Sequence, residues 1–278
     1  KFTLCEDIEI NIESTTHNVD DEKLRKLLEC GVGRLYFGVQ TFDDTIRKIF
    51  NRTDSGKQVA KMIKTAHSIG YTNVHIDLMY NLPGQNVEMW KDDLKKAIDL
   101  NVESISIFHF HVHPNLKLAA MLQSGEIQPI RNSNIAKEMY VEAVDMLRHE
   151  GYKLQTTSKF TLQDKENRYY DLFYKHPREG LGLGATNWFC SLIGSYTYKN
   201  FESLKKYSAY LRDEKFPISI GMKMSKEEEM RRMMIRGLNS GVDKSEFKKI
   251  FGNMPEDVFP EIIESLKILI LFHLKYLI

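Results

Sequence analysis

The sequence lacks an excess of charge of either sign. Its 278 residues include 39 lysines and arginines against 38 aspartates and glutamates, a formal net charge of +1 at pH 7. A chain with so little net charge has no extended field that would attract it to nucleic acid or to an anionic membrane. The composition therefore argues against a nucleic-acid-binding function.

Long apolar segments and paired cysteines are also missing. The longest apolar run, residues 268–272, is far shorter than the roughly 20 residues of a membrane-spanning helix, so we expect a soluble protein. The three cysteines, Cys5, Cys30 and Cys190, are scattered, which predicts neither a disulfide framework nor a zinc site and favours a cytoplasmic setting. The chain opens on Lys1 without a leader-like segment, so we expect no signal peptide and a piece of a longer protein.

What the first 125 residues do contain is a repeated helix and strand pattern. Helices are predicted over residues 20–30, 55–69 and 86–100, because apolar residues recur there at i, i+3, i+4 and i+7. Asp20 and Ser55 suit N-caps, and Gly31 and Gly70 suit the left-handed position that follows a helix. Strands are predicted over residues 8–13, 34–40, 73–80 and 104–111. The alternation is typical of parallel βαβ units and predicts part of an α/β barrel.

The second half of the chain has a different pattern. A helix expected over residues 134–150 leads to a fifth extended segment, residues 153–160, and a glycine-rich segment follows at residues 180–185. From Phe201 on, the pattern is mostly helical, and Ser225 with Glu228 forms the S-x-x-E pattern of a capping box. We therefore expect a barrel part over residues 1–125 and a mostly helical accessory domain over residues 126–278.

Polar or ionisable side chains occur at or near the end of each predicted barrel strand. They are Glu13, Gln40, Asp77, and the alternating His109, His111 and His113. Reacting groups gather at the carboxyl ends of the strands in parallel barrels, so four such strands together point to a site there. The alternating histidines match the H-x-H pattern of metal sites. No second histidine set or carboxylate pair completes such a centre, so we predict no metal ligands in this chain and rim histidines that line a pocket instead.

Two motifs at a defined spacing carry a family resemblance. Residues 34–44 read R-L-Y-F-G-V-Q-T-F-D-D, residues 76–85 read I-D-L-M-Y-N-L-P-G-Q, and Asn51-Arg52 lies between them. This combination resembles the radical S-adenosylmethionine (SAM) enzymes of the oxygen-independent coproporphyrinogen III oxidase class, over most of the chain. The resemblance implies a partial radical-SAM (β/α)6 barrel, of which strands three to six are present, followed by an accessory domain.

The resemblance also implies a SAM site at the mouth of the barrel. The matching positions are Glu13, Gln40, Arg52, Asp77, His111 and Trp188. The first four match side chains that hold the nucleoside and the amino-acid tail of SAM, the fifth matches a backbone contact to the adenine, and the last matches a contact from the accessory domain. Carboxylates suit the ribose hydroxyls and the cationic groups of SAM, while amide and guanidinium groups suit its carboxylate.

The iron-sulfur cluster of that family has no recognisable ligands in this chain. The family holds a 4Fe-4S cluster on a C-x-x-x-C-x-x-C run, which three isolated cysteines cannot replace. We expect that run to lie upstream of Lys1, so that the fragment alone is inactive. The resemblance further implies a reducing electron donor such as a flavodoxin or a ferredoxin.

Three activities within the class remain open. The first is a radical SAM oxidoreductase that generates a 5′-deoxyadenosyl radical to act on a porphyrin or a related tetrapyrrole. The alternatives are a heme-degrading radical SAM methyltransferase of heme utilisation and a non-catalytic heme-binding chaperone on the same scaffold. Residues 166–171 lack the His and the Trp of the chaperone motif H-N-x-x-Y-W, and look more like the heme-utilisation branch. Asn81 replaces the usual Gly, which marks a divergent member.

Overall fold

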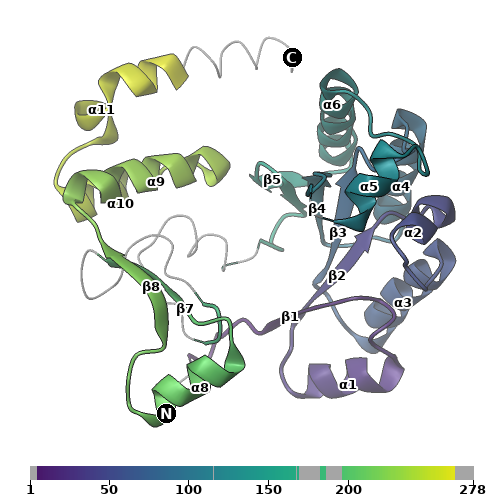
Figure 1. Ribbon diagram of the computed structural model, residues 1–278, viewed down its shortest axis with the longest axis horizontal. Coiled ribbons are helices and arrows are strands. Elements are labelled where there is room, and N and C mark those ends of the chain that lie inside the picture. The colour runs from purple at the N-terminus through teal and green to yellow at the C-terminus, as the bar shows by residue number, and fades with distance from the viewer. Residues whose placement is uncertain (1–4, 115, 167, 169–181, 186–195, 267–278) are drawn as a thin grey trace. The chain divides into compact units, whose positions relative to one another are not determined.

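The computed structural model divides the chain into two compact units, residues 1–166 and residues 167–278 (Figure 1). It describes residues 5–114, 116–166, 168, 182–185 and 196–266. Within these residues, none of the helices combines the length and the apolar character needed to cross a membrane. The two units are described one after the other.

A six-stranded sheet organises the first unit, in the order β1-β2-β3-β4-β6-β5. The strands are β1 (Asn11–Ser14), β2 (Arg34–Gln40), β3 (Val74–Tyr80), β4 (Ser104–His109), β5 (Lys153–Thr156) and β6 (Lys159–Thr161). Strands β1 to β4 pair in parallel, which confirms the predicted βαβ pattern. The predicted fifth strand, residues 153–160, is instead a hairpin, because a turn at residues 157–158 separates β5 from the antiparallel β6.

Six helices connect and cover these strands in the described part of the first unit. They are α1 (Asp21–Glu29), α2 (Asp44–Ile49), α3 (Gly56–Ile69), α4 (Val87–Asp99), α5 (Lys117–Gln123) and α6 (Ser133–His149). The predicted caps are confirmed: Asp20 accepts a hydrogen bond from the Lys23 amide, and Ser55 forms a capping box with Gln58. Gly70 ends α3 at φ 119°, a backbone conformation that favours glycine.

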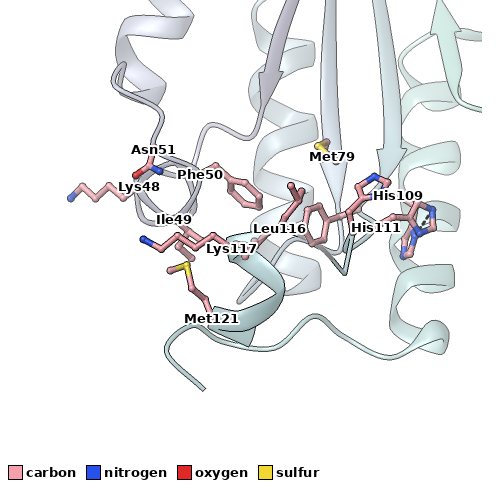
Figure 2. Close-up of a pocket in the computed structure, with 13 residues that line it drawn as sticks. Lys48, Ile49, Phe50, Asn51, Met79, His109, His111, Leu116, Lys117 and Met121 are labelled. Carbon is pink, nitrogen blue, oxygen red and sulfur yellow. Dashed lines mark hydrogen bonds between the residues drawn. The ribbon is translucent and has the colours of Figure 1, made fainter. Parts of the chain in front are cut away.

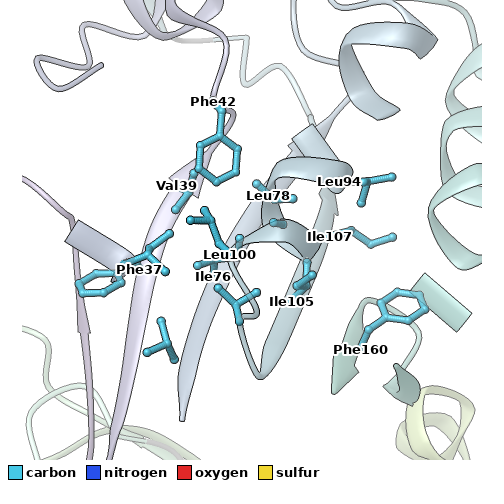
Figure 3. Packing of buried hydrophobic residues seen from close by; sticks show 14 of the residues in the cluster. Phe37, Val39, Phe42, Ile76, Leu78, Leu94, Leu100, Ile105, Ile107 and Phe160 are labelled. Carbon is cyan, nitrogen blue, oxygen red and sulfur yellow. The ribbon is translucent and has the colours of Figure 1, made fainter. Parts of the chain in front are cut away.

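The two faces of the sheet differ in chemistry because side chains alternate along each strand. One face carries the apolar residues Phe37, Val39, Ile76, Leu78, Ile105 and Ile107, which are buried against the helices in the main core (Figure 3). The opposite face carries Arg34, Tyr36, His75, Asp77, Ser106 and Lys159. The first unit therefore has an apolar outer layer under its helices and a polar inner face.

The compact units divide later than the predicted domains, which met at residues 125 and 126. Helix α6 and the β5-β6 hairpin belong to the first unit. The reason is packing: Met139 and Leu147 of α6 lie in the same core as β3 and β4, and β6 pairs with β4 through Ile105 and Phe160. The sheet thus includes strands that the sequence analysis assigned to the accessory domain.

The second unit has little sheet in its described residues. Its elements are β7 (Tyr196–Asn200), α8 (Leu204–Arg212), β8 (Ile218–Lys223), α9 (Lys226–Ser240), α10 (Lys244–Phe251) and α11 (Pro255–Val258). Strands β7 and β8 pair antiparallel. Ser225 and Glu228 form the predicted capping box of α9. A small core joins Met230 and Met233 of α9 to Phe247 and Phe251 of α10.

Candidate active site at the carboxyl edge of the sheet

Three of the predicted SAM residues converge on Gly38 of β2. The guanidinium of Arg52 donates a hydrogen bond to the Gly38 carbonyl over 3.1 Å. The amide nitrogen Nε2 of Gln40 lies close to the place where a side chain at Gly38 would begin, since a Cβ built on Gly38 would be only 3.0 Å from it. Asp77 is the register partner of Gly38 on the neighbouring strand β3. The Gln40 amide, the Arg52 guanidinium and the backbone position of Asp77 are therefore all adjacent to this glycine.

The local backbone of β2 explains how Gln40 reaches this point. The strand has a register shift between Gly38 and Gln40, and Gln40 has a positive φ of 69°. A positive φ is uncommon for a residue with a side chain, and it is often found at functional sites. The G-V-Q motif thus combines a bulge with an empty position, and together they fold the Gln40 amide back over the strand.

Two further predicted site residues, Glu13 and His111, take no part in these contacts at Gly38. Glu13 is exposed on the edge strand β1, and its register partner Tyr36 lies two residues before Gly38. His111 lies just beyond the end of β4, with an exposed side chain. Trp188 lies outside the residues that the structure describes.

Arg52 is held near Gly38 by a buried neighbour that the sequence analysis did not identify. Arg47 of α2 is almost fully buried, donates to the carbonyls of Val39 and Thr41 over 3.0 and 2.8 Å, and forms an ion pair with Asp54. Thr16, in the segment after β1, donates to the same carboxylate. Burial and the adjacent Arg47 charge lower the pKa of Arg52. Arg47 and Asp54 therefore fasten the loop that carries Arg52 to the ends of β1 and β2.

A second buried carboxylate fastens the loops that follow β2 and β3. Asp93 of α4 accepts hydrogen bonds from the Thr41 hydroxyl and the Phe42 amide, both over 2.7 Å. Gln85, the last residue of the L-P-G-Q motif, is also buried, and its Oε1 accepts from the Leu82 amide. Burial raises the pKa of Asp93 to about 6. These contacts give the T-F and P-G-Q parts of the motifs a structural role beside the site.

Asp77 is backed by a histidine in the polar inner face. The ring nitrogen Nε2 of His75 lies 3.1 Å from Asp77 Oδ1 and 2.9 Å from the Ser106 hydroxyl. Desolvation by complete burial lowers the pKa of His75 to about 4, so the ring is neutral at pH 7. Because a carboxylate oxygen accepts hydrogen bonds, Nε2 carries the ring proton and donates a hydrogen bond to Asp77. His75 thereby orients the Asp77 carboxylate, which is partly exposed.

A buried lysine of the β5-β6 hairpin, Lys159, lies on the same inner face of the sheet as His75 and Asp77. The ammonium of Lys159 is 3.3 Å from the Tyr36 hydroxyl, and Tyr36 stacks on His75 with ring centroids 4.3 Å apart. Burial lowers the pKa of Lys159 to about 7. Arg34 donates to Glu9 on the same face over 2.8 Å. No sequence pattern indicated Lys159, because the turn of the β5-β6 hairpin brings it across from strands that precede it by more than 50 residues.

His109, the last residue of β4, and His111 form a hydrogen-bonded chain that begins at Asn81. The Asn81 amide nitrogen lies 3.0 Å from His109 Nε2, and His109 Nδ1 lies 3.3 Å from His111 Nε2. The Asn81 oxygen accepts from the Arg131 amide over 2.8 Å, which fixes the amide nitrogen as the donor. His109 therefore accepts at Nε2 and donates at Nδ1, and His111 accepts at Nε2 and carries its proton at Nδ1.

A cavity of about 640 Å³ adjoins these histidines at the ends of β3 and β4 (Figure 2). Its walls come from α2, from the segment after β4 and from α5. Met79 in its lining lies two residues after Asp77, on the same face of β3, and Asn51 directly precedes Arg52. The cavity is therefore next to the Gly38 site along two separate segments of the chain.

The described residues fit SAM and do not fit an iron-sulfur cluster. Carboxylate, amide and guanidinium groups around the open position at Gly38 match the hydroxyl, ammonium and carboxylate groups of SAM. In contrast, Cys5 and Cys30 are exposed and lie in separate segments. Among the residues with described positions, no group of three or more His, Cys, Asp or Glu could hold a metal ion. The described part of the chain therefore offers no ligand set for such a cluster.

Known proteins provide an independent comparison. Residues 1–97 match the model of the radical SAM superfamily. The chain is 28% identical to the heme chaperone HemW of Bacillus subtilis over 93% of its own length and 68% of that protein. It is 25% identical to the anaerobilin synthase of Escherichia coli O157:H7, over 87% of its own length and 53% of that protein.

A solved structure has the same fold. Coproporphyrinogen III oxidase HemN of Escherichia coli superposes with a TM-score of 0.75 at 24% identity, over 95% of this chain and 63% of HemN. The α/β fold with its parallel strands is thus that of a partial radical-SAM barrel followed by a further region. Its motifs, the family match over residues 1–97 and these relatives support the resemblance of this chain to the HemN-like class of radical SAM proteins, which includes the oxygen-independent coproporphyrinogen III oxidases.

Proposed function

We propose that this chain provides the SAM-binding part of a radical SAM enzyme of the oxygen-independent coproporphyrinogen III oxidase class, acting on a porphyrin or a related tetrapyrrole. The observation that carries the proposal is that Gln40, Arg52 and Asp77 are each adjacent to Gly38. The similarity to this class supports it, because in that class SAM supplies a 5′-deoxyadenosyl radical that abstracts hydrogen from the substrate. A reducing electron donor, such as a flavodoxin or a ferredoxin, and a cytoplasmic setting belong to the same proposal.

Each residue at the site suits one part of SAM. Asp77, oriented by His75, accepts from a ribose hydroxyl or from the ammonium group. Arg52 has further donors besides the one used on Gly38, and these suit the SAM carboxylate. Gln40 offers both a donor and an acceptor beside them. Glu13 on β1 adds a second carboxylate on the same side of β2, and the backbone at His111 faces the adenine.

Heme-directed relatives favour a second candidate function. The similarity to HemW is 28% identity over 93% of the chain, so we retain a non-catalytic heme-binding chaperone on this scaffold as the alternative. The anaerobilin synthase similarity likewise retains the heme-degrading methyltransferase of heme utilisation. Of the nearest run to the chaperone motif, residues 166–171, only Glu166 and Arg168 lie within the described part of the chain.

The three candidate functions differ in whether SAM is consumed and in what happens to the tetrapyrrole. Protein purified anaerobically from its native source is mixed with SAM, a reductant and either coproporphyrinogen III or heme, and 5′-deoxyadenosine and tetrapyrrole products are quantified. The oxidase proposal predicts 5′-deoxyadenosine together with decarboxylated porphyrinogen. Multiple turnovers that open or methylate heme would contradict the oxidase proposal and establish the heme-utilisation activity. Stoichiometric heme binding without SAM consumption would instead establish the chaperone.

A further inference from the structure

A groove of about 410 Å³ lies between helices α3 and α4, and its described lining residues differ from those of the cavity beside the Gly38 site. Its apolar part is formed by Phe42, Ala60 and Leu100. Exposed lysines border this part from both helices. They are Lys57 and Lys64 of α3 and Lys96 of α4. The α3-α4 groove, as we call it, therefore has a small apolar base and a positively charged rim.

The positive charge of this rim is not balanced by its own helix. Helix α3 has no aspartate or glutamate among its 14 residues, although a negative charge in the first turn stabilises a helix. Lys57 occupies that first turn instead, and departures from such local rules are concentrated at functional sites. Within the described part of the chain, Lys57, Lys64 and Lys96 make no hydrogen bond or ion pair. Their ammonium groups are therefore available to carboxylates of another molecule.

Two carboxylates in the groove restrict the kind of molecule that fits. Asp44 and Asp99 also line it, and Asp44 accepts a hydrogen bond from the Gly56 amide over 2.7 Å. A nucleic acid carries a negative charge at every phosphate, so it would place some of them against these aspartates. A protein segment can instead place carboxylates beside the lysines and uncharged side chains beside the aspartates. Charge complementarity therefore favours a protein.

The spacing and the rigidity of the groove suit a helix. Lys57 and Lys64 are separated by about 10 Å along α3, and residues i and i+7 of a second helix have the same separation. The start of α3 is fixed against the end of β2, because a Cβ at Gly56 would overlap the Phe42 carbonyl. A groove that is formed in advance reduces the entropy that binding costs.

We propose that the α3-α4 groove docks an acidic helical segment of a partner protein. Its carboxylates pair with Lys57, Lys64 and Lys96, and an apolar side chain between them packs on Ala60. This inference goes beyond the proposed function and does not depend on it, since none of these residues belongs to the SAM site.

Two fluorescein-labelled helical peptides of equal length test the charge pairing. One has glutamates at positions i, i+3 and i+7 with a leucine on the same face, and the other has glutamines in their place. Fluorescence anisotropy gives the Kd of each peptide for the protein and for Lys57→Glu/Lys64→Glu. We expect the glutamate peptide to bind about tenfold more tightly than the glutamine peptide, and the double variant to weaken its binding about tenfold.

The matched control is Lys137→Glu/Lys205→Glu, which reverses two exposed lysines of α6 and α8. It changes the net charge of the protein by the same amount as Lys57→Glu/Lys64→Glu, so it measures the effect of long-range attraction alone. The Kd of the glutamate peptide should be the same for this control and for the unaltered protein.

Ala60→Gln distinguishes docking in the groove from attraction to a charged surface. The longer, uncharged side chain occupies the apolar base, so the Kd of the glutamate peptide should rise about fivefold. Absence of binding below about 1 mM, an equal loss in the control pair, or an unchanged Kd in Ala60→Gln would overturn the inference. So would tighter binding of single-stranded RNA that is lost in Lys57→Glu/Lys64→Glu, which would assign the groove to nucleic acid.

Discussion

Buried polar residues on the inner face of the sheet link the stability of the protein to its site. His75 is fully buried, neutral and bonded to Asp77, while Lys159 and Tyr36 lie against it. Each of these groups would be solvated in the unfolded chain, so protonation of His75 is opposed only in the folded state. This difference predicts a measurable pH dependence.

The folded pKa of His75, about 4, lies below its ordinary value of 6.5, so the unfolded chain binds the proton more readily. The free energy of unfolding should therefore fall as the pH decreases from about 6.5 to about 4, by up to about 3 kcal/mol from this residue. In His75→Gln, which keeps an amide donor near the position of Nε2, this loss should be absent. Urea unfolding at a series of pH values measures it.

The comparison with the variant is needed because Asp93 acts in the opposite direction. Its raised folded pKa of about 6 increases stability as the pH falls toward 3.8. The difference between the wild type and His75→Gln removes this contribution. A difference that is constant between pH 4 and 6.5 would contradict the assignment of His75 as a neutral buried donor.

Adding a single methyl group at Gly38 tests whether this position belongs to the SAM site. A Cβ at this position would be 3.0 Å from Gln40 Nε2, so Gly38→Ala should shift the Gln40 amide and weaken SAM binding, by at most about tenfold, the effect of one lost hydrogen bond. Gly33→Ala is the control, since nothing lies within 4 Å of its added methyl group. Isothermal calorimetry gives both affinities. Equal SAM affinity in the two variants would show that the open position at Gly38 is not part of the site.

At the scale of elements, α2 depends on a buried ion pair. Arg47 lies among carbonyls of the β2 end and pairs with Asp54, which also binds Thr16. Arg47→Ala should lower the free energy of unfolding by about 3 to 5 kcal/mol, because it leaves a mostly buried carboxylate without its partner. Lys48→Ala, on the same helix and exposed, should change it by less than about 0.5 kcal/mol. Chemical denaturation that gives similar values for both would refute this role of Arg47.

The turn after β3 gives a second prediction at this scale. Asn81 has a φ of 61°, and its buried amide bonds to Arg131 and His109. Asn81→Gly keeps a backbone suited to this φ and removes these hydrogen bonds, so it should cost about 1 to 3 kcal/mol of stability. Nitrogen NMR of the imidazoles should show that His109 and His111 lose their single tautomers. Unchanged tautomers would mean that Asn81 does not set them.

Local signals explain which elements could be predicted from the sequence. Helices α1, α3 and α4 have an apolar period and an N-cap at Asp20, Ser55 or Asn86, and all three were predicted to within one or two residues. Helix α2 has only six residues, and it is held by Arg47 rather than by an apolar stripe. The β5-β6 hairpin was missed because its turn, Thr157-Ser158, has neither Gly nor Asn to mark it.

At the scale of the whole molecule, the candidate site contains two kinds of residues. Some are indicated by sequence motifs, and others are brought to the site only by the fold. Gln40, Arg52 and Asp77 follow from the family motifs, and the structure places them at one glycine. Lys159, Arg47 and Asp93 support them from other segments, and no local pattern distinguishes these residues from surface charges. Their role depends on burial, which results from tertiary packing. Sequence reasoning therefore indicated the candidate ligand-binding residues, which stay a prediction, but not the buried residues that hold their segments in place.

The central claim is that this chain binds SAM at the carboxyl edge of its parallel strands. The most direct measurement is calorimetric titration of SAM into the protein, into Asp77→Ala and into the distant control Asp92→Ala, an exposed carboxylate on α4. The account predicts binding to the wild type and the control, and a loss of about 1 to 3 kcal/mol of binding free energy for Asp77→Ala. Equal SAM affinity for all three proteins would contradict it.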